Sequence, residues 1–244
     1  MRNFYNENHT VNYSEVDANG NLRIDYIFSE LQRITAFHSR EMGCDGGKIL
    51  KDCNAIWVLG KMKLQILDFP SMFDSIDLQT WPTKVSAVRF SRDYKIQKDL
   101  KDIVLATSEW CVLDANTHTL RRGNTICYPF EMEHKTELSG CQDFSKLKEN
   151  LLETDFNHSH CVRYTDVDMN NHTNNIAYVR MALNCFTVEE LDQFKISEIE
   201  MYYLNESYFN DNIKVYKKQT DYGYFICGKI GDKTIFDCVI KGEK

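Results

Sequence analysis

Three side chains that can do acid–base chemistry alternate in one short segment of the sequence. Asp168, Asn170 and His172 are separated from one another by single residues. A carboxylate can act as a base or nucleophile, or can orient an imidazole. An amide can donate a hydrogen bond to a carbonyl oxygen on which charge develops, and an imidazole exchanges protons near neutral pH. The segment therefore has the groups needed for chemistry at a carbonyl carbon.

Two other interpretations of this segment compete with catalysis. Asp and Asn are common helix caps, and His172 would then be a hydrogen-bonded neighbour of the cap. The spacing Asp166-x-Asp168-x-Asn170 also resembles the start of a calcium loop. Such loops need an acidic residue at their twelfth position, where this chain has Ala177. The calcium interpretation fails, whereas the capping interpretation stays open.

The segment is the second copy of an internal repeat. Tyr13–Asn19 has the same pattern as Tyr164–Asn170, and its own calcium-like spacing fails because Tyr26 is at the twelfth position. The copies differ at the imidazole, since the counterpart of His172 is Asn21. Duplication followed by loss of chemistry in one copy would leave this asymmetry. We therefore expect the C-terminal half to carry the site.

Each copy precedes a pattern typical of an amphipathic helix. Gly43 is a stop signal for the first helix, and Asn174 or Asn175 can cap the second. The apolar stripes are Ile27, Leu31, Ile34 and Phe37 in the first helix, and Ile176, Val179, Leu183 and Phe186 in the second.

Strand-like runs follow each helix, and Gly231-Asp232 is a tight-turn signal between two of them. The runs are Ala55–Leu59, Phe73–Leu78 and Ile103–Leu113 in the first half, and Asn210–Val215, Tyr224–Ile230 and Thr234–Ile240 in the second. A helix packed on a curved antiparallel sheet in each half predicts an α+β fold with two similar domains, packed as a pseudo-dimer. The predicted organisation is an N-terminal domain (1–130), a polar connector (131–157) and a C-terminal catalytic domain (158–244).

Composition narrows the class of protein. The net charge of −7 argues against a nucleic-acid-binding protein. We find neither a signal peptide nor an apolar run long enough to span a bilayer, and the nine cysteines include no C-x-x-C pair. We therefore expect a cytoplasmic protein with free thiols. Cys161 and Cys185 flank the motif, but nothing in the sequence marks either as an activated nucleophile.

Nearly the whole chain resembles the acyl-acyl-carrier-protein thioesterases of plants and bacteria, whose fold is a tandem of two hot dog domains. The most specific stretch is Asp166-x-Asp168-x-Asn170-x-His172-x-Asn174-Asn175-x-x-Tyr178. The first half contributes Tyr13, Val16, Asp17, Asn19-Gly20, Leu31-Gln32, Ala36, His38, Trp57-Val58-Leu59 and Thr80-Trp81.

The resemblance implies a catalytic network of Asp168, Asn170, His172 and a downstream glutamate, which falls on Glu206. Plant members have a cysteine directly after this glutamate, whereas this chain has Ser207. That difference argues further against a cysteine mechanism. No metal and no organic cofactor is expected.

The implied reaction is hydrolysis of a fatty acyl thioester on acyl carrier protein. Asn170 and His172 would hold the carbonyl while Asp168 or Glu206 activates water; alternatively, Asp168 would attack directly and form an anhydride. The N-terminal domain would shape the acyl tunnel, with a gain of ~0.8 kcal/mol per buried methylene. Arg121-Arg122 and Lys217-Lys218 are candidate carrier contacts.

Three rival functions and the oligomeric state stay open, with a homodimer as one expectation. The rivals are an acyl-coenzyme A thioesterase, a hydratase or dehydratase on a similar fold, and a non-catalytic acyl-binding protein.

Overall fold

The computed structural model describes residues 3–131, 135, 137–141, 143–145 and 148–243. It divides into two compact units, Met1–Gln142 and Asp143–Lys244. The boundary falls within the predicted connector, of which residues 132–134, 136, 142, 146 and 147 lie outside the described residues. No helix in the described ranges is long and apolar enough to cross a membrane.

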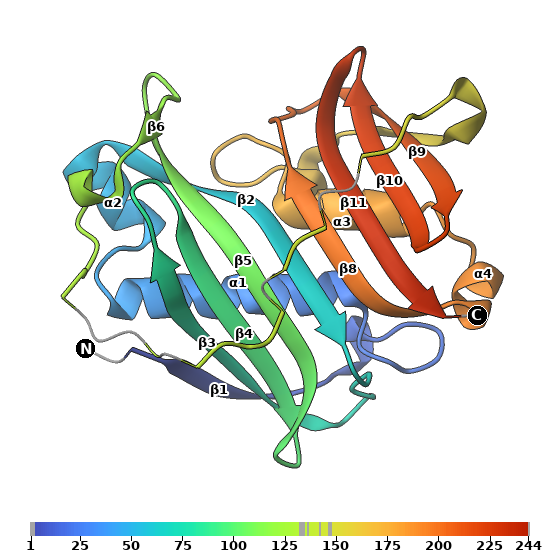
Figure 1. The fold of residues 1–244 in the computed structure, drawn as a ribbon, viewed down its shortest axis with the longest axis horizontal. Helices are drawn as coiled ribbons and strands as arrows, with labels where there is room; N and C mark the ends of the chain where they lie inside the picture. Colours follow the sequence, from blue (N-terminus) through green and yellow to red (C-terminus); the bar gives the residue numbers. More distant parts are fainter. Residues whose placement is uncertain (1–2, 132–134, 136, 142, 146–147, 244) are drawn as a thin grey trace. The chain divides into compact units, whose positions relative to one another are not determined.

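The first unit is a long helix, α1, packed on an antiparallel sheet (Figure 1). The strand order is β1-β3-β4-β5-β2, and β6 pairs with β5. The helix is tied to the sheet through Thr35 of α1, whose Oγ1 lies 2.9 Å from the buried Tyr94 hydroxyl of β4. The elements are β1 (Tyr5–Thr10), α1 (Ile24–Glu41), α2 (Gly46–Cys53), β2 (Ala55–Ile66), β3 (Ser75–Val85), β4 (Phe90–Lys98), β5 (Lys101–Asp114) and β6 (Leu120–Arg121).

The second unit repeats this arrangement, without a counterpart of β6 among its described residues. Its sheet has the order β7-β9-β10-β11-β8, and the shorter helix α3 packs on β10. Each unit is therefore a helix against an antiparallel sheet, as in the hot dog fold, and the α+β prediction is confirmed. The elements are β7 (Phe156–Cys161), α3 (Asn175–Leu183), α4 (Val188–Gln193), β8 (Lys195–Tyr203), β9 (Asn212–Thr220), β10 (Gly223–Ile230) and β11 (Lys233–Glu243).

Both predicted helices form, but their buried faces differ from the predicted apolar stripes. Phe37 is 47% exposed, and His38 is fully buried in its place. His38 follows Ile34 by four residues, which keeps it on the buried face, whereas Phe37 is turned away from that face. In α3 of the second unit only Val179 of the predicted stripe is buried, and Ile176 and Leu183 are partly exposed. This helix ends at Leu183, so Phe186 packs on Tyr224 from outside the helix.

The predicted strands are confirmed as parts of longer strands, with one shared error at their starts. Prediction began two strands at Phe73 and Asn210, but β3 begins at Ser75 and β9 at Asn212. Phe73 and Asn210 have φ values of 71° and 69°, in a left-handed conformation that interrupts an extended strand. Sequence patterns did not reveal β1, β4, β6, β7, β8, α2 or α4.

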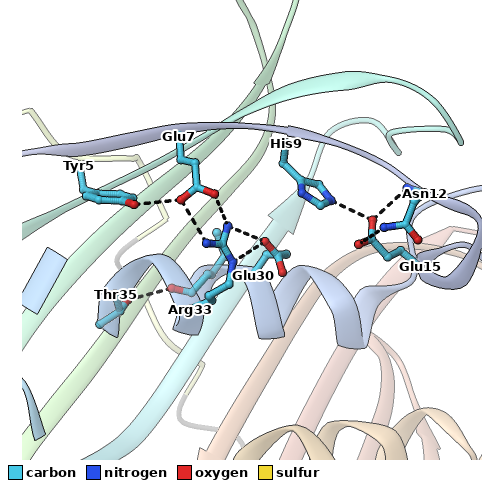
Figure 2. A network of polar contacts seen from close by, with 9 residues as sticks. Tyr5, Glu7, His9, Asn12, Glu15, Glu30, Arg33 and Thr35 are labelled. Atoms are coloured by element: carbon cyan, nitrogen blue, oxygen red, sulfur yellow. Dashed lines mark hydrogen bonds and ion pairs between the residues drawn. The ribbon is translucent and has the colours of Figure 1, made fainter. Parts of the chain in front are cut away.

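A polar network ties β1 to α1 in the first unit (Figure 2). The Arg33 guanidinium bonds both Glu7 of β1, at 3.1 Å from Nη1, and Glu30 of its own helix, at 2.9 Å from Nε. Tyr5 donates a third hydrogen bond to Glu7, at 2.9 Å. Because Arg33 and Glu7 come from different elements, this network fixes the edge strand against the helix.

We expect Gly223→Ala to destabilise the second unit strongly. Gly223 begins β10 with φ of 135°, and an added Cβ would lie 2.2 Å from the carbonyl oxygen of Ile240. The combined conformational and steric cost should be about 3 kcal/mol. The matched control is Gly20→Ala, at φ of 77° with nothing within 4 Å of the added Cβ, which should cost about 1 kcal/mol. Equal denaturation midpoints for the two variants would contradict this assignment.

Candidate active site

The motif of the second copy forms a tight loop between β7 and α3. Asp168 Oδ1 accepts hydrogen bonds from the backbone N–H of Asn170 at 2.8 Å and of His172 at 3.4 Å. The backbone N–H of Asp168 donates to the carbonyl of His172 at 2.9 Å. Asn174 then caps α3 by accepting from Ile176 N at 2.8 Å, so the capping role belongs to Asn174. Asp168 instead holds the loop that presents His172.

The first copy forms the same loop without the imidazole. Asp17 Oδ1 accepts from the backbone N–H groups of Asn19 at 2.9 Å and Asn21 at 3.0 Å. The backbone N–H of Asp17 donates to the carbonyl of Asn21 at 2.8 Å. The fold of the loop therefore does not depend on a histidine.

A second contact, between a histidine and a carboxylate, is also shared by both copies. His9 Nε2 lies 2.8 Å from Glu15 Oε2 in the first unit, as Figure 2 shows. His160 Nε2 lies 2.8 Å from Asp166 Oδ2 in the second. Since this pair occurs in both copies, it is part of the common framework and not of a site found in one copy.

The structure brings His172 and Glu206 together. His172 Nδ1 lies 3.7 Å from Glu206 Oε1, and the two side chains are 23% and 32% exposed. A partly exposed carboxylate beside an imidazole can orient the ring and stabilise its protonated form, while solvent and substrate still reach it. Asp168 is joined to His172 through the backbone of the loop. In the described part of the chain, the side-chain amide of Asn170 makes no hydrogen bond to the other three predicted residues.

The equivalent positions of the first copy lack both groups. Thr173 N donates to the carbonyl of Ser207, and Leu22 N donates to the carbonyl of Pro70 in the same way. This match aligns Ser207 with Pro70, and hence Glu206 with Phe69. The second unit alone therefore combines an imidazole and a carboxylate on this framework.

Ser207 supports the site from a buried position. Its Oγ lies 2.6 Å from Thr173 Oγ1 and 2.9 Å from the Tyr178 hydroxyl, and all three residues are buried. Burial raises the pKa of Tyr178, so the phenol stays a proton donor at neutral pH. The predicted site did not include Thr173, although this residue directly follows His172 and could have been proposed as a supporting residue for that reason.

We expect Ser207→Ala to lower stability while leaving hydrolysis nearly unchanged. The substitution removes two buried hydrogen bonds, although Thr173 Oγ1 keeps its bond to the Ser207 carbonyl at 3.1 Å, and should cost about 1–3 kcal/mol. Because the Ser207 hydroxyl is bonded inside the core, it is not placed to attack a substrate. Ser197→Ala, at an exposed serine, should change stability by less than about 0.5 kcal/mol. A loss of turnover comparable to that of a His172 variant, measured on folded protein, would contradict the supporting role.

The flanking cysteines are poor nucleophile candidates. Burial raises the pKa of Cys185 to about 12, so its thiol is protonated at neutral pH. Cys161 Sγ lies 4.0 Å from the carbonyl oxygen of Asn210, a backbone contact that does not activate a thiol. No group of three potential metal ligands occurs among the described residues.

The basic pairs considered for carrier docking are largely engaged within the chain. Lys217 Nζ lies 2.8 Å from Glu190, and Lys218 Nζ lies 2.9 Å from Glu149. Arg121 donates to the carbonyls of Cys53 and Thr125. These contacts give the three side chains structural roles and weaken the docking hypothesis for them.

Relatives of this chain carry out one kind of reaction, as their names state. It is 26% identical over 222 residues to the chloroplastic oleoyl-acyl carrier protein thioesterase of Coriandrum sativum, covering 85% of this chain and 60% of that protein. The chain thus spans less than two thirds of that relative. An oleoyl-acyl carrier protein thioesterase of Arabidopsis thaliana is 25% identical over 225 residues, with the same coverage of each chain.

Solved structures share the fold over the full length. An acyl-ACP thioesterase from Bacteroides thetaiotaomicron superposes with a TM-score of 0.88 at 21% identity, covering 99% of this chain and 98% of the other. The 12:0-ACP thioesterase from Umbellularia californica gives 0.84 at 14% identity, covering 100% and 98%. At these identities the similarity establishes the tandem fold.

Family models settle the membership. The model of the acyl-ACP thioesterase N-terminal domain matches residues 2–125, and that of the C-terminal domain matches residues 149–238. The two matches follow the order of the two units and include the loops of both copies. The chain therefore belongs to the acyl-acyl-carrier-protein thioesterase family.

Proposed function

We propose that this protein hydrolyses the thioester of a fatty acyl group on acyl carrier protein, releasing a fatty acid and the free phosphopantetheine thiol. The observation that carries the proposal is the His172–Glu206 pair, 3.7 Å apart; the first unit reproduces the loop of His172 without either group. The family membership supports this substrate class and a role in fatty acid synthesis. The cytoplasmic location is a separate part of the proposal, since the relatives named above are chloroplastic.

The reaction needs a water oxygen to attack the carbonyl carbon, cleavage of the carbon–sulfur bond, and a proton for the departing thiolate. His172 is placed to exchange that proton, with Glu206 orienting its ring. Asn170, on the exposed side of the loop, can donate to the carbonyl oxygen as charge develops on it. None of these steps requires a metal or an organic cofactor.

Asp168 has two candidate roles. The two backbone hydrogen bonds that its side chain accepts both end on Oδ1, and none ends on Oδ2 among the described residues. The Oδ2 atom could therefore activate water or attack the thioester directly to give an anhydride that water cleaves. In a single turnover in ¹⁸O-labelled water, label in the Asp168 carboxylate would identify direct attack, with water opening the anhydride at the aspartyl carbon. An acyl group trapped on Asp168 by hydroxylamine would identify direct attack when water opens the anhydride at the acyl carbon.

The proposal is tested by free-thiol release from matched panels of acyl carrier protein and coenzyme A thioesters. We expect turnover on the carrier-protein substrates, with a preference among chain lengths. Turnover on coenzyme A esters alone would keep the chemistry and change the partner. Double-bond hydration or dehydration with the thioester intact would indicate a hydratase or dehydratase. Tight acyl binding without release would identify a binding protein and overturn the proposal.

A further inference from the structure

Tyr208 lies beside the His172–Glu206 pair and contacts both members of it. Its hydroxyl donates to Glu206 Oε2 at 3.1 Å, while the other carboxylate oxygen faces His172 Nδ1 at 3.7 Å. Its ring meets the imidazole edge to face, with centroids 5.2 Å apart and an interplanar angle of 78°. Glu206 is thus shared between a phenol on one oxygen and an imidazole on the other.

We propose that Tyr208 is a positioning residue that holds the Glu206 carboxylate against His172. This inference rests on the proposed hydrolase function. A glutamate side chain has several rotamers, and at 32% exposure little packing selects one of them. A second anchor on the carboxylate and a ring against the imidazole restrict both partners. A preorganised pair reacts faster than one that must first find its geometry.

The internal repeat supplies a comparison within the same chain. Tyr208 N donates to Asp211 Oδ2 at 2.8 Å, and Ser71 N donates to Asp74 Oδ2 at 2.7 Å in the first unit. The backbone at the two positions is therefore held alike, and only the side chain differs. Position 71 needs no phenol, because the first-unit counterparts of Glu206 and His172 are Phe69 and Asn21.

The three groups found only in the second unit thus form one contact set: His172, Glu206 and Tyr208. Their first-unit counterparts are Asn21, Phe69 and Ser71. A contact shared by both units, such as His160 with Asp166 and its counterpart His9 with Glu15, needs no catalytic explanation. A phenol that only stabilised the loop would be expected in both copies.

The chemistry of Tyr208 suits a permanent donor. Burial and then its hydrogen bond to Glu206 raise the pKa of the phenol. The hydroxyl therefore keeps its proton at neutral pH and donates to the carboxylate. Its role is to orient Glu206, and it does not supply the proton for the leaving thiolate.

The test compares Tyr208→Phe with Tyr164→Phe, a second exposed tyrosine of the same unit that is 87% exposed. Loss of one hydrogen bond to a partly exposed carboxylate should lower kcat about 3- to 10-fold. KM should stay within about twofold, because the hydroxyl acts through Glu206 and not on the bound acyl chain. Tyr164→Phe should leave both constants unchanged. Equal kinetics for the two variants would overturn the inference.

Two further measurements sharpen the test: a double-mutant cycle asks whether Tyr208 acts through Glu206, and a spectroscopic measurement does not depend on the reaction. In a Glu206→Gln background, Tyr208→Phe should have almost no further effect on the residual kcat, whereas an additive effect would contradict action through Glu206. The ¹H–¹⁵N signals of the His172 ring, assigned by their absence in His172→Asn, should move in Tyr208→Phe and not in Tyr164→Phe. Unchanged ring signals would overturn the positioning role. Signals that move in a protein without thiol release would keep the contact set and refute the hydrolase.

Discussion

Replacing His172 with asparagine should reduce thioester hydrolysis by about 10²- to 10⁴-fold while the protein stays folded. Asparagine is the residue that the first unit has at the equivalent position, Asn21, in a loop with the same backbone hydrogen bonds. The substitution therefore removes the imidazole without asking the loop to adopt a new conformation. The expected loss lies in kcat, since the proposed role of the imidazole is to give a proton to the leaving thiolate.

Thiol release and thermal unfolding of the same preparation measure this outcome. The matched control is Asn21→Ala in the first unit, which should leave kcat within about twofold if that loop has no catalytic role. A His172→Asn variant that keeps wild-type turnover would show that the catalytic site is not in the C-terminal unit. A comparable loss in Asn21→Ala would mean that the first loop takes part as well.

Asp168→Asn should show the second-largest loss of activity. The counterpart Asp17→Asn measures how much of the change comes from loop structure alone. An asparagine oxygen can still accept both backbone hydrogen bonds, but without the charge that strengthens them. Each variant should therefore lose about 1 kcal/mol of stability. Only Asp168→Asn should also lose catalysis, by about 10²-fold or more, because a neutral amide can neither activate water nor attack the thioester.

Paired measurements of unfolding free energy and kcat on these two variants decide the role of Asp168. Similar destabilisation with activity lost in Asp168→Asn alone separates catalysis from loop structure. If Asp168→Asn retains activity, the carboxylate is structural in both copies and Glu206 remains as the group that acts with His172. If both variants lose activity equally, loop geometry limits the reaction.

The internal repeat made much of this architecture predictable from sequence. Two copies of one pattern, each followed by a helical stripe and strand-like runs, indicated two similar α+β units, and the helices begin near the predicted residues. The longest strands were found because their apolar alternation is strong, as in Ile103–Leu113 within β5. Short or polar strands such as β1 and β7 carry no such signal, since β7 reads FNHSHC.

Some features depend on backbone conformations that residue types do not reveal. Phe73 and Asn210 occupy left-handed positions that delay β3 and β9, although neither is a glycine. Likewise, only the packed helix shows that His38 replaces Phe37 on the buried face of α1. In each case neighbouring elements held in place by long-range hydrogen bonds impose the local geometry, and tertiary contacts override local preference.

The sequence by itself determined the repeat, the asymmetry between the copies and three candidate groups within five residues, Asp168, Asn170 and His172. Glu206 was assigned only through the family resemblance, because nothing in the residues around Glu206 indicates that it lies near the distant His172. The tertiary structure decided that Glu206 meets His172, that Tyr208 contacts both, and that Ser207 is bonded inside the core. The physical reason is that a periodic pattern encodes which face of an element is buried, whereas contact between two loops depends on how the sheet and helix between them pack.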